Sequence, residues 1–163
     1  MKYCAIFASR GEDDREEETV SQETAERSAA AMWANDQASQ GLGMEIAAIA
    51  PGRCTMRMPV EARMLNGLAT CHGGYIFTLA DSAFAFACNS HNQMTVAQHC
   101  AVTFHAPGRL GDVLTATAEE VTLQGRSGLY DVMVHNQDGT LIASFRGHSR
   151  AVKGQHFHQE QDA

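Results

Sequence analysis

Residues 75–88 limit how this chain can fold more than any other segment, because they are apolar on nearly every side. The segment combines several aromatic side chains with small apolar residues, and it offers no polar face at helical spacing. A helix of this composition is stable only where other elements bury it. The sequence therefore predicts one buried helix that follows the glycine-bearing loop 66–74, with the remaining elements packed around it.

Alternating polar and apolar residues predict strands on both sides of this helix. In 53–60, Cys54, Met56 and Met58 fall on one side and polar residues on the other, which is the pattern of a half-exposed strand. Residues 44–50 form a hairpin with that strand through a Pro-Gly turn. Further strands are expected near 94–105, 112–124, 127–137 and 140–152, the last two joined by an Asp-Gly hairpin turn.

The segment from about 20 to 40 is rich in Ala, Glu and Gln, and its spacing predicts one amphipathic helix that ends at Gly41 and Gly43. The whole order is then a helix, two strands, the buried helix and four strands. This order predicts an α+β fold in which an antiparallel β-sheet wraps around a long central α-helix.

The length of 163 residues fits one domain, which is expected to span 20–154. Residues 1–19 contain almost nothing to bury and carry many acidic side chains, so they are expected to form a mobile acidic leader. Residues 155–163 are expected to form a short tail.

The charge balance of the chain excludes several classes of partner. Lys and Arg total 12 and Asp and Glu total 19, which gives a formal net charge of −7 at pH 7. An acidic chain without a basic cluster is poorly suited to nucleic-acid phosphates or to an anionic membrane surface. Five cysteines without a CxxC pair indicate a reducing compartment, and no apolar run approaches the length of a transmembrane helix. We therefore expect a cytoplasmic protein with no nucleic-acid or membrane partner.

Asp81 lies in the middle of the most apolar helix of the chain. In an amphipathic helix such a residue would face solvent or pair with an arginine, but this helix has no polar face to hold it. An isolated buried carboxylate costs several kcal/mol or shifts its pKa. Because a chain seldom retains that cost without a use, Asp81 is a candidate catalytic acid or base, and its pKa is expected to be raised.

The run His72-Gly73-Gly74 begins the same helix. The two glycines could serve only a tight turn or close packing. Alternatively, their amides, free of side chains at a helix N-terminus, could approach and polarise an oxygen atom or hold a developing oxyanion. The presence of Asp81 on the same helix favours the second interpretation.

The spacing between these two features predicts a site shared by two subunits. Eight residues separate Gly73 from Asp81, which corresponds to about 12 Å along a helix. One carbonyl group cannot contact both groups of a single chain. If both act on one substrate, they must come from different subunits, so we expect at least a dimer.

Three groups of residues resemble one known family. Residues 65–90 combine Asn66 with the Cys-His-Gly-Gly run at 71–74 and the Leu-Ala-Asp-Ser-Ala-Phe-Ala run at 79–85. They resemble the hotdog-fold acyl-CoA thioesterases, and among these the PaaI type of phenylacetate catabolism. The runs at 104–112 and 130–149 look like the same group. The resemblance covers about 30–154.

The resemblance implies a role for each matching residue. Asp81 matches the catalytic acid, which acts as a general base for water or as a nucleophile on the thioester. Gly73 matches the amide donor to the thioester carbonyl, and Gly74 is assigned beside it to substrate binding. Asn66 matches a polar residue near the reacting centre, and His72 is expected to shape the loop. We expect no cofactor. The sites of the family are shared between subunits, usually in a dimer of dimers.

The resemblance also implies the reaction, which is hydrolysis of acyl-CoA, with phenylacetyl- or hydroxyphenylacetyl-CoA as expected substrates. Two alternatives remain open at this point. The chain could be a hotdog hydratase or dehydratase, although such enzymes usually pair a catalytic histidine with an acid. It could also be a non-catalytic acyl-CoA binding protein that uses the same cleft.

Two other kinds of chemistry have weaker support. Cys71 and His72 could form a thiol nucleophile and its base, but adjacent residues rarely face each other. The remaining histidines and cysteines have no closed four-ligand spacing, so we expect no metal site.

The CoA phosphates require basic partners, for which Arg109, Arg126, Arg146, Arg150 and Lys153 are candidates.

Overall fold

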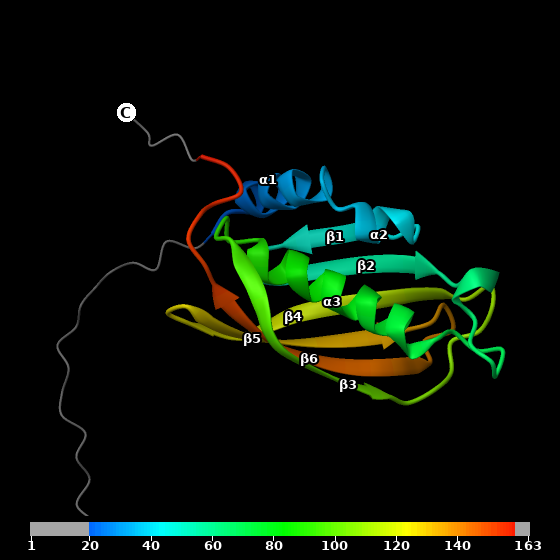
Figure 1. Ribbon diagram of the computed structural model, residues 1–163. Helices are drawn as coiled ribbons and strands as arrows, with labels where there is room; N and C mark the ends of the chain where they lie inside the picture. Colours follow the sequence, from blue (N-terminus) through cyan, green and yellow to red (C-terminus); the bar gives the residue numbers. More distant parts are fainter. Residues whose placement is uncertain (1–19, 159–163) are drawn as a thin grey trace, which may run out of the picture.

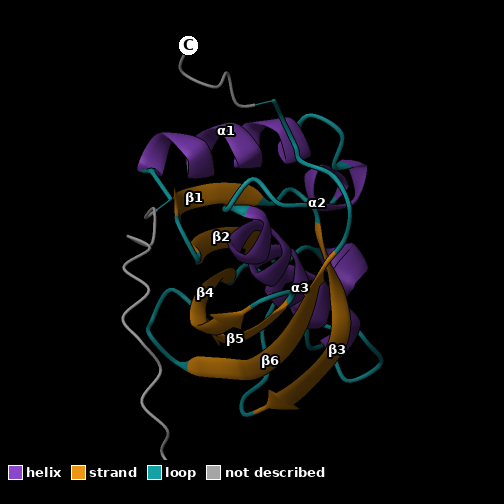
Figure 2. Cartoon of the chain, turned by 90° about the vertical axis from the view of Figure 1, so that its left-hand side faces the viewer, coloured by secondary structure: helices purple, strands orange, loops and turns teal. Residues whose placement is uncertain are grey.

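Six antiparallel strands form one sheet that curves around the helix α3 (Gly73–Asn89), as Figures 1 and 2 show. The computed structural model describes residues 20–158, so the expected leader 1–19 and the end of the expected tail, 159–163, lie outside the described residues. The strand order in the sheet is β1-β2-β4-β5-β6-β3. The strands are β1 (Glu45–Ala50), β2 (Arg53–Pro59), β3 (Thr95–Phe104), β4 (Val113–Gln124), β5 (Ser127–His135) and β6 (Leu141–Ala151). The predicted sheet around a central helix is confirmed.

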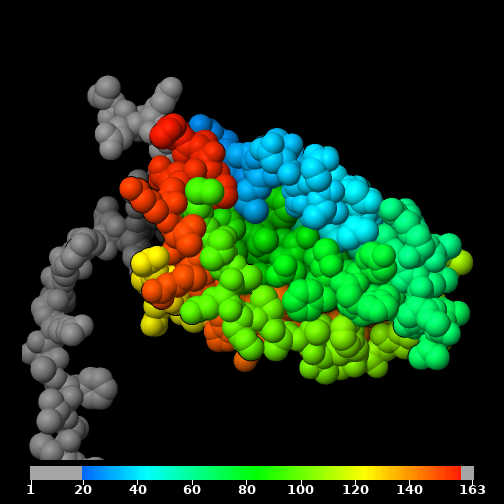
Figure 3. All heavy atoms as spheres, in the orientation of Figure 1, coloured from blue at the N-terminus to red at the C-terminus, as the bar shows by residue number. Residues whose placement is uncertain are grey.

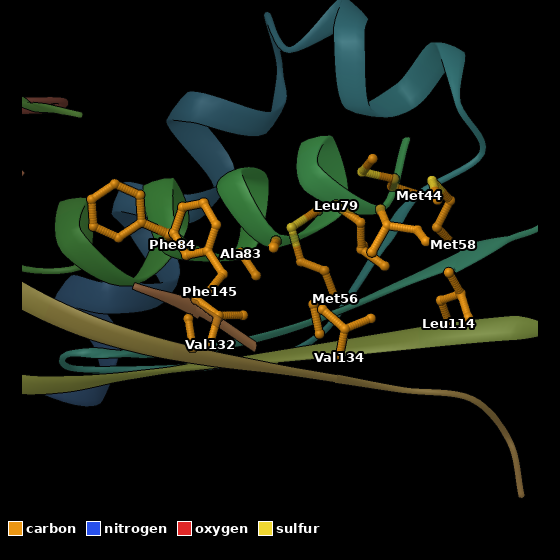
Figure 4. Close-up of a cluster of buried hydrophobic side chains, with 14 of the residues drawn as sticks. Met44, Met56, Met58, Leu79, Ala83, Phe84, Leu114, Val132, Val134 and Phe145 are labelled. Carbon is orange, nitrogen blue, oxygen red and sulfur yellow. The ribbon is translucent and has the colours of Figure 1, made fainter. Parts of the chain in front are cut away.

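The core lies between α3 and the concave face of the sheet (Figure 4). In β2, the alternate residues Cys54, Met56 and Met58 are fully buried, as their spacing predicts. They pack with apolar side chains of α3 such as Leu79 and Phe84. Each large apolar side chain removed from water in this way contributes about 1.5–3 kcal/mol. This packing fixes the position of α3 along the sheet.

The prediction of one helix over 20–40 is wrong in one respect, because the structure has two helices there. These are α1 (Gln22–Trp33) and α2 (Gln37–Gly41). The cause is Asp36, whose carboxylate accepts a hydrogen bond from the Ser39 N–H at 3.0 Å and caps a new helix. The second helix ends at Gly41, as the sequence predicts.

The prediction that α3 is buried on all sides is only partly right. Its sheet-facing side is mostly buried, but a strip of six residues remains half-buried: Tyr75, Phe77, Thr78, Asp81, Ser82 and Ala85. Figure 3 shows green atoms from the α3 region at the surface, between the blue α1–α2 region and the yellow-green β3 region. The strip exists because the described sheet ends at β3 and does not close around the helix.

The strand β3 forms one edge of the sheet and is paired only with β6. It is ten residues long, and most of its side chains are exposed, including Val96 and Phe104. Its Cys100 contacts Asp81 on α3, so the free edge and the half-buried strip of α3 are neighbours. A long, uncovered edge strand is a template for pairing with another chain.

Candidate active site at the start and middle of the central helix

His72 caps the N-terminus of α3. Its backbone is extended, with φ −62° and ψ 133°, and the Gly74 N–H donates to His72 Nδ1 at 2.9 Å. The Tyr75 N–H donates to the His72 carbonyl at 2.9 Å. Because Nδ1 accepts, it is the unprotonated nitrogen of the ring. The cap uses the Gly74 N–H, which the sequence analysis assigned to substrate binding.

Gly73 provides a free amide at this helix end. Its N–H finds no acceptor among residues 20–158 and lies where the helix dipole is positive. A Cβ at this position would lie 2.9 Å from Cζ of Phe104, so the aromatic ring closely covers the glycine. Any larger residue would push Phe104 away or shield the amide.

The two ends of the Asn66 side-chain amide have different roles: its oxygen is hydrogen-bonded within the loop, and its nitrogen is directed to the cleft. Its Oδ1 accepts three hydrogen bonds, from Leu68 N–H at 2.9 Å, Thr70 N–H at 3.3 Å and Thr70 Oγ1 at 3.2 Å. These bonds identify which end of the amide is the oxygen. The Nδ2 group has no acceptor within residues 20–158, which leaves it available as a donor.

Asn66 and Gly73 line the same cleft, which has a volume of about 420 Å³. Phe104 and Ile76 contribute apolar walls, and the segment 105–107 closes another side. The cleft therefore combines apolar lining with two hydrogen-bond donors, the Asn66 NH₂ and the Gly73 N–H. That combination suits a carbonyl oxygen that gains negative charge during a reaction.

Asp81 lies on the half-buried strip of α3, two turns beyond this cleft. Its Oδ1 is 3.8 Å from Cys100 Sγ, and the thiol donates to it. Burial raises the pKa of Asp81 above its usual range, and the hydrogen bond from Cys100 offsets part of that shift. The raised pKa that the sequence predicts is confirmed in direction and in cause.

The five site residues predicted from the sequence do not meet within one subunit. Asn66 and Gly73 share the cleft described above, whereas His72 and Gly74 line a second cleft of about 470 Å³. Asp81 lines neither of these clefts. The carboxylate in the middle of α3 therefore lies apart from the two free donors, which are at the N-terminal end of α3 and in the loop before it.

The structure adds three residues that the sequence analysis did not assign to the site. Thr70 fixes the Asn66 side chain, and its position four residues after the Asn66 of an Asn-Gly pair is a local signal for such a loop. Phe104 and Cys100 reach α3 only because β3 folds back along it. The sequence near α3 carries no signal for that contact.

The alternative thiol nucleophile is not supported by the geometry. Cys71 is buried, and both burial and the charge of Asp112 raise the pKa of its thiol, which keeps it protonated. Its Sγ contacts the carbonyl oxygen of His72.

Among residues 20–158, no three His, Cys, Asp or Glu side chains are grouped to bind a metal ion. No helix in this part of the chain is long and apolar enough to span a membrane.

Comparison with known proteins reveals clear relatives. The family model of the thioesterase superfamily matches residues 68–143. The acyl-coenzyme A thioesterase PaaI of Escherichia coli K12 is 45% identical over 129 residues, which cover 78% of this chain and 91% of that protein. Human acyl-coenzyme A thioesterase 13 is 32% identical over 60% of this chain and 71% of its own length.

Solved structures show the same relationship. The E. coli PaaI protein, from the phenylacetic acid degradation operon, superposes with a TM-score of 0.81 and 42% identity, covering 82% of this chain and 97% of that one. A hypothetical thioesterase of Streptococcus pneumoniae TIGR4, solved with coenzyme A, gives a TM-score of 0.66 at 28% identity. That match covers 69% of this chain and 87% of the other.

Proposed function

Because this chain belongs to the thioesterase superfamily, we propose that it hydrolyses the thioester bond of acyl-CoA substrates to the free acid and CoA. One observation carries the proposal. A cleft at the N-terminus of α3 has two free hydrogen-bond donors, one from the helix and one from the loop before it, and the middle of α3 carries a half-buried carboxylate of raised pKa. These are the groups that hydrolysis of a thioester needs.

The proposed reaction uses Asp81 as a general base. Asp81 removes a proton from a water molecule as its oxygen attacks the thioester carbonyl carbon, and a raised pKa makes the carboxylate a better base near neutral pH. The Gly73 N–H and the Asn66 NH₂ stabilise the negative charge on the former carbonyl oxygen. The C–S bond then breaks, and the leaving CoA thiolate takes up the proton that Asp81 removed from water, which restores the carboxylate.

We propose further that each site is formed by two subunits paired through β3. In an antiparallel β3 pair centred on Val102, Cys100 of one subunit lies opposite Phe104 of the partner subunit. Because Cys100 contacts Asp81 and Phe104 covers Gly73, this register brings the carboxylate of one subunit close to the partner's cleft. The free edge of β3 and the half-buried strip of α3 support this arrangement.

We also propose that two such dimers pack into a tetramer through a second contact. The outer face of the sheet exposes Val113 and Met133, whose neighbours Leu114, Val132 and Val134 are buried on the inner face. Exposed apolar side chains on the outer face support packing of one dimer against another. We also propose a cytoplasmic location, which agrees with the free thiols of Cys54, Cys71, Cys88 and Cys100.

The proposed acyl group is phenylacetyl or hydroxyphenylacetyl. Support comes from the similarity to PaaI and from the aromatic wall that Phe104 contributes to the cleft. The proposal is tested by measuring thiol release from phenylacetyl-, hydroxyphenylacetyl-, benzoyl-, short-chain and long-chain acyl-CoA. We expect release from at least one aryl thioester at a higher kcat/KM than from the aliphatic ones.

Other outcomes of this experiment point to the alternatives. Tight binding of acyl-CoA with no thiol release would contradict the proposal and indicate a binding protein. A change in enoyl absorbance without thiol release would indicate a hydratase or dehydratase. Preference for an aliphatic thioester would keep the reaction but contradict the aryl substrate.

A further inference from the structure

Asp81 has one side-chain hydrogen-bond partner among residues 20–158, and that partner is Cys100. No charged side chain in the described chain contributes to the shift in the pKa of Asp81, which arises from burial and from this one contact. The titratable group in contact with the carboxylate is the Cys100 thiol on β3. The charge of Asp81 also raises the pKa of Cys88, which lies about two turns further along α3. The proposed base therefore sits in an apolar setting with a single fixed donor.

We propose that Cys100 is a positioning residue for Asp81, and that its neutral thiol donates to Oδ1 and holds the carboxylate in one orientation. This inference rests on the proposed function of Asp81. In this arrangement Cys100, on the edge strand β3, orients the carboxylate of Asp81 through Oδ1. The other oxygen, Oδ2, is then free to accept the proton of a water molecule. Two rotatable bonds separate a carboxylate from its helix, so an anchored oxygen reduces the orientations that it samples.

The protonation state of Cys100 suits this role. Burial, together with the charge of Asp81, raises the pKa of the Cys100 thiol to about 11. The thiol is therefore protonated at neutral pH, so it can donate a hydrogen bond but is a poor nucleophile. In return, the bond favours the ionised form of Asp81 and opposes the effect of burial.

Cys88 provides a matched control because it is a second buried thiol, on the same helix as Asp81, and the charge of Asp81 raises its pKa. Burial raises its pKa to about 12, so it is also neutral. Its Sγ, however, donates to the carbonyl oxygen of Ala85 at 3.4 Å and not to the carboxylate. Removing Cys88 should disturb the packing of the same helix without removing a hydrogen bond to Asp81.

The test compares pH profiles of thiol release for the parent, Cys100→Ala, Cys100→Ser and Cys88→Ala. In Cys100→Ala we expect the acidic limb of kcat/KM to move up by about half a pH unit, because the ionised carboxylate loses its donor. We also expect kcat to fall about tenfold at neutral pH with little change in KM. Cys100→Ser keeps a donor and should restore most of kcat, and Cys88→Ala should keep the acidic limb of the parent.

A direct titration of Asp81 by carbon NMR in the same proteins provides a readout that does not depend on turnover. Should Cys100→Ala prove unstable, Cys100→Val fills the space without a donor and serves in its place. An unchanged acidic limb and an unchanged Asp81 titration would overturn the inference, as would a serine variant no better than alanine. Failure of the parent to release thiol would instead contradict the proposed function.

Discussion

Replacing Asp81 with asparagine is expected to reduce thiol release by about a thousandfold while acyl-CoA binding persists. Asparagine has nearly the same shape but cannot accept a proton from water, and general-base catalysis contributes about 10²–10⁴-fold. The donors in the cleft, Asn66 and Gly73, are unchanged, so the ground-state contacts to the thioester carbonyl should remain. The measurement is steady-state thiol release together with binding of a non-hydrolysable acyl-CoA analogue.

The same variant should be more stable than the parent at neutral pH. The pKa of Asp81 is raised in the folded chain, so ionising the residue costs the folded state more than the unfolded state. That cost is present above the folded pKa and disappears as the pH falls below the ordinary value of about 3.9. A thermal melt of Asp81→Asn at pH 7 should therefore show a higher Tm, with a gap that narrows in acid.

These two results separate the possible roles of Asp81. A fall in activity together with a fall in Tm would indicate that asparagine damages the fold. Retention of more than about a tenth of the parent kcat would contradict the role of Asp81 as the base. Lost turnover, retained binding and a higher Tm together are expected only for a carboxylate kept for function at a cost in stability.

Changing Asn66 to aspartate is expected to lower kcat by about a hundredfold or more. The Oδ1 of aspartate can still accept from Leu68 and Thr70, so the loop should keep its shape. The free NH₂ donor, however, is replaced by a negatively charged oxygen where the reaction itself develops negative charge. The measurement is kcat and KM for the best acyl-CoA substrate.

Gly67→Ala is the control for this variant. Gly67 is next to Asn66 in the same loop, has no strained φ, and a Cβ there would meet nothing within 4 Å. This change should leave kcat close to that of the parent. Equal losses in Asn66→Asp and Gly67→Ala would show that the loop, and not the amide donor, controls the rate.

Local patterns were sufficient to predict the elements that lie around the core. The alternation of Cys54, Met56 and Met58 predicts β2 because residues two apart share one face of a strand. The apolar stretch that became α3 predicts a buried helix. Its half-buried strip was missed, although the polar residues Thr78, Asp81 and Ser82, at positions i, i+3 and i+4, mark that face of the helix. The break between α1 and α2 was missed because the cap formed by Asp36 outweighs the helical spacing around it.

The site could be predicted only where its residues are close in sequence. Asn66, His72 and Gly73 belong to one loop and the helix that follows, so their spacing identifies them. Phe104 and Cys100 are more than fifteen residues from the helix positions they contact, and only the path of β3 brings them there. The distance from Gly73 to Asp81 along α3 was predictable from helix geometry, and it led to the proposal of a shared site.

Mixing two inactive variants tests that proposal most directly. Asp81→Asn and Asn66→Asp chains with different tags are co-expressed, and specific activity is measured on the purified mixture. If Asp81 of one subunit acts in the partner's cleft, a dimer with one chain of each variant has one intact site out of two. Random pairing makes about half of the dimers of this mixed kind, so about a quarter of the parent activity is restored. If each site lies within a single subunit, every site carries one of the two changes. The mixture would then show no activity above that of the separate variants, and the shared site would be contradicted.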